Sequence, residues 1–311
     1  MSRIRPPAPV RRTAVALLLV ALAAPALSAC TDGSDTTRTT DAAEANARTP
    51  GKNAPAPAVT GIRKITSTTG LVLPLERQLF SDPELGLVMR AREKLIQSCM
   101  RGLDHDYTSP KPQRRVGPKT LVERRYGLAD ARLAADHGYH MPGRAIRPDP
   151  ELPDEQYDAI TGKGSPKGVP RGGCAGAAER RIAGETPFGP ADIAQDLNGH
   201  SYRLSMRDRR VKEVFRSWSS CMRTAGHTYP DPMKAMSAPG FSRATTGVGE
   251  VDTAMDDVAC KKKTNLIGIW YAVETAYQHQ LIEQNAKKLE AVTEAKRDQL
   301  KAARKVMDSS T

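Results

Sequence analysis

The chain has 311 residues, a formal net charge of +12 and five cysteines. Beyond the first thirty residues no apolar run approaches the roughly 20 residues that a membrane-spanning helix needs, which excludes a protein with several transmembrane helices. The excess of basic residues favours anionic neighbours such as lipid headgroups or acidic wall polymers, although the same charge also serves plain solubility.

Residues 1–29 have the layout of a bacterial signal peptide. Four arginines without an acidic residue precede Thr13–Leu27, an apolar stretch that is short for a membrane span and suits the h-region. Leu27-Ser28-Ala29-Cys30 closes this stretch and looks like a lipobox, in which the cysteine thiol receives a diacylglyceryl group and cleavage occurs just before it. An ordinary secretory signal with an incidental cysteine is the alternative. The flanks of the paired arginines fit the twin-arginine motif poorly, so we expect general secretory export.

These features predict a lipoprotein that the lipid on Cys30 holds on the extracytoplasmic face of the cell membrane. Cleavage removes four arginines and lowers the net charge from +12 to about +8. Besides the membrane itself, the expected partners at this location are anionic lipid, a wall polymer or an envelope protein, and nucleic acid is not among them.

The composition after the signal predicts a flexible tether followed by two regions. Residues 31–58 are rich in Thr, Ala, Asp, Asn and Pro and have almost no large apolar residue, so they cannot form a core. We therefore expect a tether over residues 30–70, a first helical repeat region over 71–200, and a second over 201–311.

Four cysteines remain once Cys30 carries lipid, namely Cys99, Cys174, Cys221 and Cys260. In an oxidising compartment an even set predicts two disulfides, for which three connectivities are possible. Redox chemistry or metal binding is the other interpretation. No C-x-x-C sequence occurs and the spacings do not suit zinc, so we expect no metal site.

An internal repeat favours one of these connectivities. Ser98-Cys99-Met100-Arg101 recurs as Ser220-Cys221-Met222-Arg223, and in both copies a histidine, a tyrosine and a proline follow at the same distances. Each half then has one later cysteine. The simplest symmetric pairing is therefore Cys99–Cys174 and Cys221–Cys260.

The apolar spacing predicts mainly α structure. Apolar residues recur every three or four positions before each Cys-Met pair, with Pro83 at the start of the first helix and a capping box at Ser205 and Asp208 before the second. Short helices are expected at 129–136 and 175–182, exposed loops at 144–171 and 230–249, one short extended segment at 70–75, and a long helix or two from 251 to about 307. The expected fold is a disulfide-stapled helical domain with two divergent helix–Cys-Met repeats and a long C-terminal helix.

Several segments resemble a group of uncharacterised actinobacterial lipoproteins. They are Arg125-Tyr126-Gly127 with Gly138-Tyr139-His140, Trp218-Ser219-Ser220-Cys221-Met222, Asp257-Val258-Ala259-Cys260-Lys261, and Ile269–Glu274 with Gln278 and Asn285. The resemblance covers most of the chain after Leu71. It implies a secreted helical lipoprotein and supplies no catalytic residue or cofactor, because the group has no assigned activity.

His105 and His227 occupy equivalent places in the repeat, so a ligand or metal site shared by the two halves is one hypothesis. The alternative is that each imidazole hydrogen-bonds at its own helix end. His137 and His140 form a weaker candidate pair.

Among the acidic residues, a buried Glu274 could act as a general acid, or it could pair with a basic side chain. Basic stretches from Lys111 to Arg125 and at Lys261-Lys262-Lys263 are either a surface for anionic polymers or solvated faces.

No phosphate loop, dinucleotide fingerprint, zinc-protease motif or nucleophile elbow occurs. We therefore expect no cofactor, and the catalytic residues of any activity stay unknown. The sequence favours a non-enzymatic binding or interaction domain at the cell envelope. A hydrolase with carboxylates in a cleft between the two repeats is the alternative.

Replacing Cys30 tests the anchor. In the Cys30→Ala variant no thiol can accept the diacylglyceryl group, so the protein should leave the membrane fraction or persist as an uncleaved precursor. Cell fractionation and the mass of the N-terminal peptide measure both outcomes. Correctly cleaved Cys30→Ala protein that stays in the membrane would contradict the prediction.

Overall fold

The computed structural model describes residues 56–109, 120, 122–141, 151–189, 191–241, 246–247 and 249–309, and these lie in one compact unit. Within these ranges the chain has ten α-helices, two 3-10 helices and no strand, which confirms the mainly α prediction. The α-helices are α1 (Asp82–Gly102), α2 (Ala131–His137), α3 (Asp154–Thr161), α4 (Gly173–Ala183), α5 (Asp192–Arg207), α6 (Arg209–Thr224), α7 (Pro232–Met236), α8 (Glu250–Thr264), α9 (Leu266–Gln284) and α10 (Ala286–Asp308), and the 3-10 helices are η1 (Pro74–Gln78) and η2 (Pro239–Phe241).

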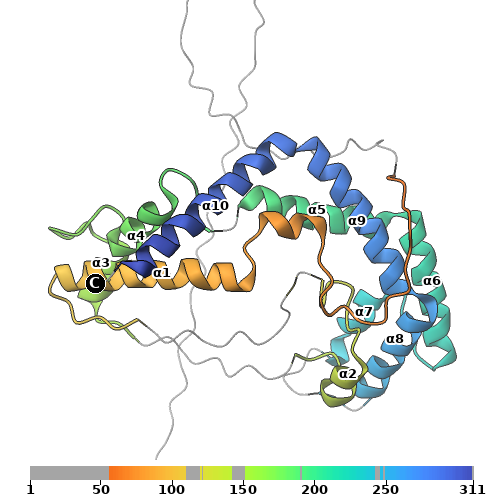
Figure 1. Cartoon of the computed structure of the whole chain (residues 1–311). Coiled ribbons are helices and arrows are strands. Elements are labelled where there is room, and N and C mark those ends of the chain that lie inside the picture. The colour runs from red at the N-terminus through yellow and green to blue at the C-terminus, as the bar shows by residue number, and fades with distance from the viewer. Residues whose placement is uncertain are drawn as a thin grey trace, which may run out of the picture. The chain divides into compact units, whose positions relative to one another are not determined.

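The helices pack in two groups. In the first, α1 lies against α10 and α4, and α3 covers α4; Figure 1 shows the dark blue α10 beside the orange α1. In the second, α9 packs against α5 and α6, while α8 contacts α6 and α2. A cluster of buried leucines and an alanine, from η1, α5, α9 and α10, connects the groups (Leu75, Ala194, Leu197, Leu281 and Leu289).

Side-chain caps set the starts of the two Cys-Met helices. Ser81 and Glu84 form a capping box at α1, with Pro83 in the first turn. Asp208 caps α6 and accepts a hydrogen bond from the Arg210 amide at 2.9 Å. The predicted cap at Ser205 is wrong, because Ser205 lies in the last turn of α5, a helix that the apolar pattern did not reveal.

Both Cys-Met helices end in the same turn. Met100 O accepts the His105 amide at 3.0 Å, and Met222 O accepts the His227 amide at 2.9 Å. The residues before the two histidines, Asp104 (φ 59°) and Gly226 (φ 90°), are left-handed, as the Schellman motif requires. Aspartate tolerates this conformation better than most residues, so the two copies share a turn despite the missing glycine.

Three further expectations need correction. The expected extended segment at 70–75 leads into the 3-10 helix η1, in which Pro74 takes the first position. The expected loops contain helices: α3 lies in 144–171, and α7 and η2 lie in 230–249. The region after residue 251 forms three helices instead of one or two, because Asn265 (φ 53°) ends α8 in the left-handed conformation and Asn285 separates α9 from α10.

Part of the expected tether packs on the core. Ile65 is buried, its amide donates to Asn265 Oδ1 at 3.1 Å, and Asn265 Nδ2 donates to Arg63 O at 3.1 Å. Residues 1–55, which include the signal and Cys30, lie outside the described residues. The division at residue 200 stays a prediction, although that residue lies within α5 and α10 packs on α1 and α4 of the first region.

The two disulfides join neighbouring helices. Cys99–Cys174 links α1 to α4 with a Cα–Cα distance of 5.6 Å, and Cys221–Cys260 links α6 to α8 at 5.7 Å. This confirms the pairing expected from the repeat. Two such bonds indicate an oxidising, extracytoplasmic compartment. None of the described helices is both long and apolar enough to cross a membrane.

Removing one disulfide at a time tests how much each contributes. The loops enclose sequence separations of 75 and 39 residues. In the chain-entropy model, the paired Cys→Ser substitutions should lower the free energy of unfolding by roughly 4.5 kcal/mol at Cys99 and Cys174, and by roughly 4 kcal/mol at Cys221 and Cys260. Denaturant unfolding measures the loss. An unchanged stability in both paired variants, or free thiols in the unmodified protein, would refute the structural role.

Candidate functional site

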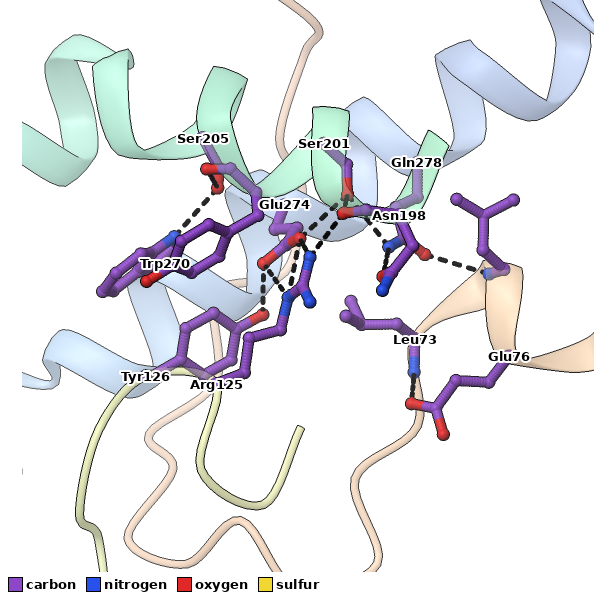
Figure 2. Close-up of polar contacts among 12 residues, drawn as sticks. Leu73, Glu76, Arg125, Tyr126, Asn198, Ser201, Ser205, Trp270, Glu274 and Gln278 are labelled. Atoms are coloured by element: carbon purple, nitrogen blue, oxygen red, sulfur yellow. Dashed lines mark hydrogen bonds and ion pairs between the residues drawn. The ribbon is translucent and has the colours of Figure 1, made fainter. Parts of the chain in front are cut away.

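A fully buried carboxylate lies at Glu274 in the middle of α9 (Figure 2). Its side chain is 0% exposed and forms an ion pair with Arg125, whose Nε lies 2.9 Å from Oε1 and 3.0 Å from Oε2. The hydroxyls of Tyr126 and Ser201 donate to the same carboxylate at 3.0 and 2.9 Å. Glu274 is therefore saturated by protein donors.

The surroundings of Glu274 shift the pKa values of Arg125 and Tyr126. Burial alone would lower the pKa of Arg125, but the hydrogen bonds and charge of Glu274 outweigh burial and raise it. Burial, together with the nearby carboxylate, raises the pKa of Tyr126 well above its usual value. The geometry matches the expectation that Glu274 pairs with a basic side chain, and gives no room for substrate beside the carboxylate.

Gln278 extends the network by one helical turn. Its Oε1 accepts the Leu75 amide at 2.9 Å, and its Nε2 donates to Asn198 Oδ1 and Ser201 Oγ at 3.0 Å each. The carboxamide thereby ties η1 and α5 to α9, as Figure 2 shows. All three contacts hold helices in place, which indicates a structural role.

A second buried ion pair lies on α8. Lys261 Nζ is 2.7 Å from Asp257 Oδ2 and donates to Leu128 O at 2.9 Å, while Trp218 Nε1 donates to Asp257 Oδ1 at 2.9 Å. A side chain at Gly127 (φ 80°) would place its Cβ 2.7 Å from Lys261 Nζ, so glycine is required there. Burial raises the pKa of Asp257 and lowers that of Lys261 against the attraction between them.

Glu250, at the start of α8, is a third buried carboxylate that protein groups engage. It accepts the Tyr139 amide at 2.8 Å and the Gly247 amide at 3.1 Å, and it lies 3.2 Å from His140 Nε2 without hydrogen-bond geometry. A Cβ at Gly138 would meet Glu250 Oε1 at 2.7 Å. The Arg-Tyr-Gly and Gly-Tyr-His segments thus pack around three buried acidic side chains, Glu274, Asp257 and Glu250.

His105 and His227 have different surroundings. His105 follows α1, whose end packs on α3 and α4. His227 follows α6 and binds α8, with Nε2 3.0 Å from Asp256 Oδ2 and Nδ1 3.4 Å from Thr253 Oγ1. Neither lines any of the three pockets described below. The shared site stays a prediction, and the geometry favours separate roles at two helix ends.

Only part of the two basic stretches, Lys111 to Arg125 and Lys261 to Lys263, falls within the described residues. Lys111, Arg114, Arg115 and Lys119 lie outside the described residues. Arg125 and Lys261 are committed to buried ion pairs, which corrects their assignment to an exposed basic face. Arg124 is half-buried and belongs to a separate pocket.

Open concave surface lies on both sides of the outer face of α9. One pocket of about 400 Å³ lies between η1 and α9, and a second of about 410 Å³ lies between residues 57–60 and α9. Thr275 and His279 line both. We call these two together the α9 pockets.

Three buried polar atoms on the lining of the α9 pockets have no hydrogen-bond partner among the described residues. They are Gln78 Oε1, Thr275 Oγ1 and Gln280 Oε1. Buried polar groups in folded proteins are nearly always satisfied, so three unsatisfied groups on residues that line two adjacent pockets indicate a missing partner. No pattern in the sequence predicts this site, because its walls come from segments about 200 residues apart.

The described residues contain no group of three or more His, Cys, Asp or Glu side chains placed to hold a metal ion. Comparisons with protein-family models, curated proteins and solved structures find no match for this chain.

Removing the Glu274 carboxylate tests whether the network is structural. Glu274→Ala leaves Arg125 buried without a counter-charge and should lower the free energy of unfolding by about 3–5 kcal/mol. Glu283→Ala removes an exposed carboxylate from the same helix and should change it by less than about 0.5 kcal/mol.

The double variant Glu274→Ala, Arg125→Met completes the test. It should be less destabilised than the sum of the single variants, because it removes the uncompensated charge. Strict additivity, measured by denaturant unfolding, would contradict the coupling inferred from the contacts.

Proposed function

We propose that this chain is a non-enzymatic binding module of the cell envelope, tethered to the membrane through lipid on Cys30. Its binding site is the α9 pockets, and its partner is a neutral, hydroxyl- and amide-rich stretch of a wall polymer. The proposal combines the lipobox-like Leu27–Cys30 segment with the oxidising compartment that the two disulfides indicate.

The observation that carries the proposal is the set of unsatisfied atoms around Thr275. The carboxamides of Gln78 and Gln280 and the hydroxyl of Thr275 can each donate and accept hydrogen bonds. A ligand with several hydroxyl or amide groups satisfies such a set, whereas a purely apolar ligand leaves it unpaired at a cost of about 1–3 kcal/mol per atom.

The pockets also have the size and shape for a polymer segment. Each falls in the range of about 300–1,000 Å³ that is typical of ligand sites, and the shared Thr275 and His279 make the two adjacent. Tyr271 supplies an aromatic wall in the first, with its hydroxyl held by Val72 O at 2.8 Å. A chain molecule can therefore contact both pockets at once.

The hydrolase alternative has less support from the geometry. Glycoside hydrolysis uses two carboxylates that face the scissile bond. Among the residues that line the α9 pockets, Glu283 is the only carboxylate, and the buried Glu250, Asp257 and Glu274 are all engaged by protein groups. The arrangement favours binding without chemistry.

Thr275→Val tests the site with little volume change. The full-length protein, extracted in detergent, should bind soluble wall glycan fragments, and the variant should bind them roughly 3–10-fold more weakly because one hydrogen bond is lost. Its stability should stay equal or rise, since the unpaired buried hydroxyl disappears.

Thr293→Val serves as the control. Its hydroxyl donates to Leu289 O at 2.9 Å within α10, outside the pockets, so glycan binding should be unchanged. Calorimetric titration measures the affinities. Equal binding by wild type and Thr275→Val, or an absence of binding by the wild type, would overturn the proposal.

A further inference from the structure

A separate hollow of about 180 Å³ lies beside α2, away from the α9 pockets. Its polar wall includes Ser67, Thr68 and Arg124, and its apolar wall includes Leu128, Leu133 and Met141. We call it the Arg124 pocket. It shares no lining residue with the α9 pockets, so an inference about it is independent of the function proposed above.

Arg124 is a half-buried cation without a carboxylate partner. Its Nη2 donates to Tyr139 O at 2.7 Å, while its Nη1 is buried and has no hydrogen-bond partner. In the part of the chain that the structure describes, no carboxylate lies within ion-pair distance of it. Burial lowers the pKa of Arg124, and no neighbouring acid offsets that effect.

Three other buried or partly buried cations of the described chain each have a carboxylate partner. Arg125 pairs with Glu274, Lys261 pairs with Asp257, and the less buried Arg210 pairs with Asp208. Arg124 is the neighbour of Arg125 in the sequence, yet its side chain lines the hollow and its buried Nη1 has no partner among the described residues. Leaving a buried guanidinium uncompensated is costly, which indicates that an external anion completes it.

Two carboxylates, Glu123 and Asp130, also line the hollow, and neither forms an ion pair with Arg124. Asp130 caps α2, with Oδ1 accepting the amides of Arg132 and Leu133 at 2.8 and 3.1 Å. The Ser67 hydroxyl oxygen accepts the Thr69 amide at 3.2 Å, which leaves its O–H to donate. Two donors, one of them charged, therefore border the hollow.

We propose that the Arg124 pocket binds a small organic carboxylate with a short apolar stem. The guanidinium matches the geometry of a carboxylate, and Ser67 adds a hydroxyl donor. The stem lies against the apolar wall, where Met141 is 41% exposed and Leu133 is half-buried. The volume lies below the usual range for drug-sized ligands, so one carboxylate with a few carbon atoms fills it.

Thermal unfolding of the full-length protein with simple anions tests the assignment. Acetate, butyrate, phosphate and chloride are compared at equal ionic strength. Butyrate should raise the unfolding midpoint with a saturable dose dependence. Its half-saturating concentration should be roughly 15-fold lower than that of acetate, because each of two added methylenes contributes about fourfold when buried.

Arg124→Met should abolish the response to butyrate and acetate without lowering the midpoint in chloride, since an unpaired charge is removed. Arg203→Met removes an exposed arginine of α5 and should keep the full response. Leu133→Ala should keep the response to acetate and reduce the advantage of butyrate. If Arg124→Met does not fold, the loss of chain-length preference in Leu133→Ala supports the site on its own.

Three results would overturn the proposal. The first is an equal response in wild type and Arg124→Met. The second is a wild-type midpoint that no anion raises above its value in chloride. The third is an Arg124-dependent response that is larger for phosphate than for butyrate, which contradicts an organic stem.

Discussion

The buried carboxylate of Glu274 is the constraint on which the second helical group depends. A buried carboxylate at 0% exposure is tolerated only when donors surround it, and here they come from two segments: Arg125 and Tyr126 from a loop, and Ser201 from α5. The loop and α5 must therefore take defined places on α9 before the group can be buried. Hydrophobic contacts alone would leave these positions less determined, because apolar surfaces tolerate sliding.

The same principle recurs along α8 and α9. Asp257 is engaged by Lys261 and Trp218, and Glu250 accepts the amides of Tyr139 and Gly247. Two short segments, 125–127 and 138–140, supply many of these contacts. Arg125-Tyr126-Gly127 brings two donors to Glu274 and leaves space for Lys261, and Gly138-Tyr139-His140 wraps Glu250. The residue types in these two segments are explained by the contacts they make with buried acidic side chains, without any catalytic role.

The sequence predicted features whose causes are local. The spacing of apolar residues showed α1 and α6, and the count and repeat of cysteines gave both disulfides. It did not predict the contact of Leu75 with Gln278, which are 203 residues apart, or the unpaired state of Arg124 beside the paired Arg125. Such features depend on which side chains the packed helices bring together. The breaks at Asn265 and Asn285 were missed because asparagine is also common within helices and loops.

The packing of α10 on α1 has a consequence for how the chain folds. Val88 and Ala91 of α1 are covered by Leu300, Ala303 and Val306, and Lys296 of α10 pairs with Glu84 at 2.9 Å. The first helix is thus completed by the last one. A chain that emerges from its N-terminus holds α1 with an open apolar side until the final turns arrive, and closing this long-range contact is entropically slow. The Cys99–Cys174 bond joins the end of α1 to the start of α4 across α2 and α3, so oxidation can link α1 to α4 while the covering helix α10 is still absent.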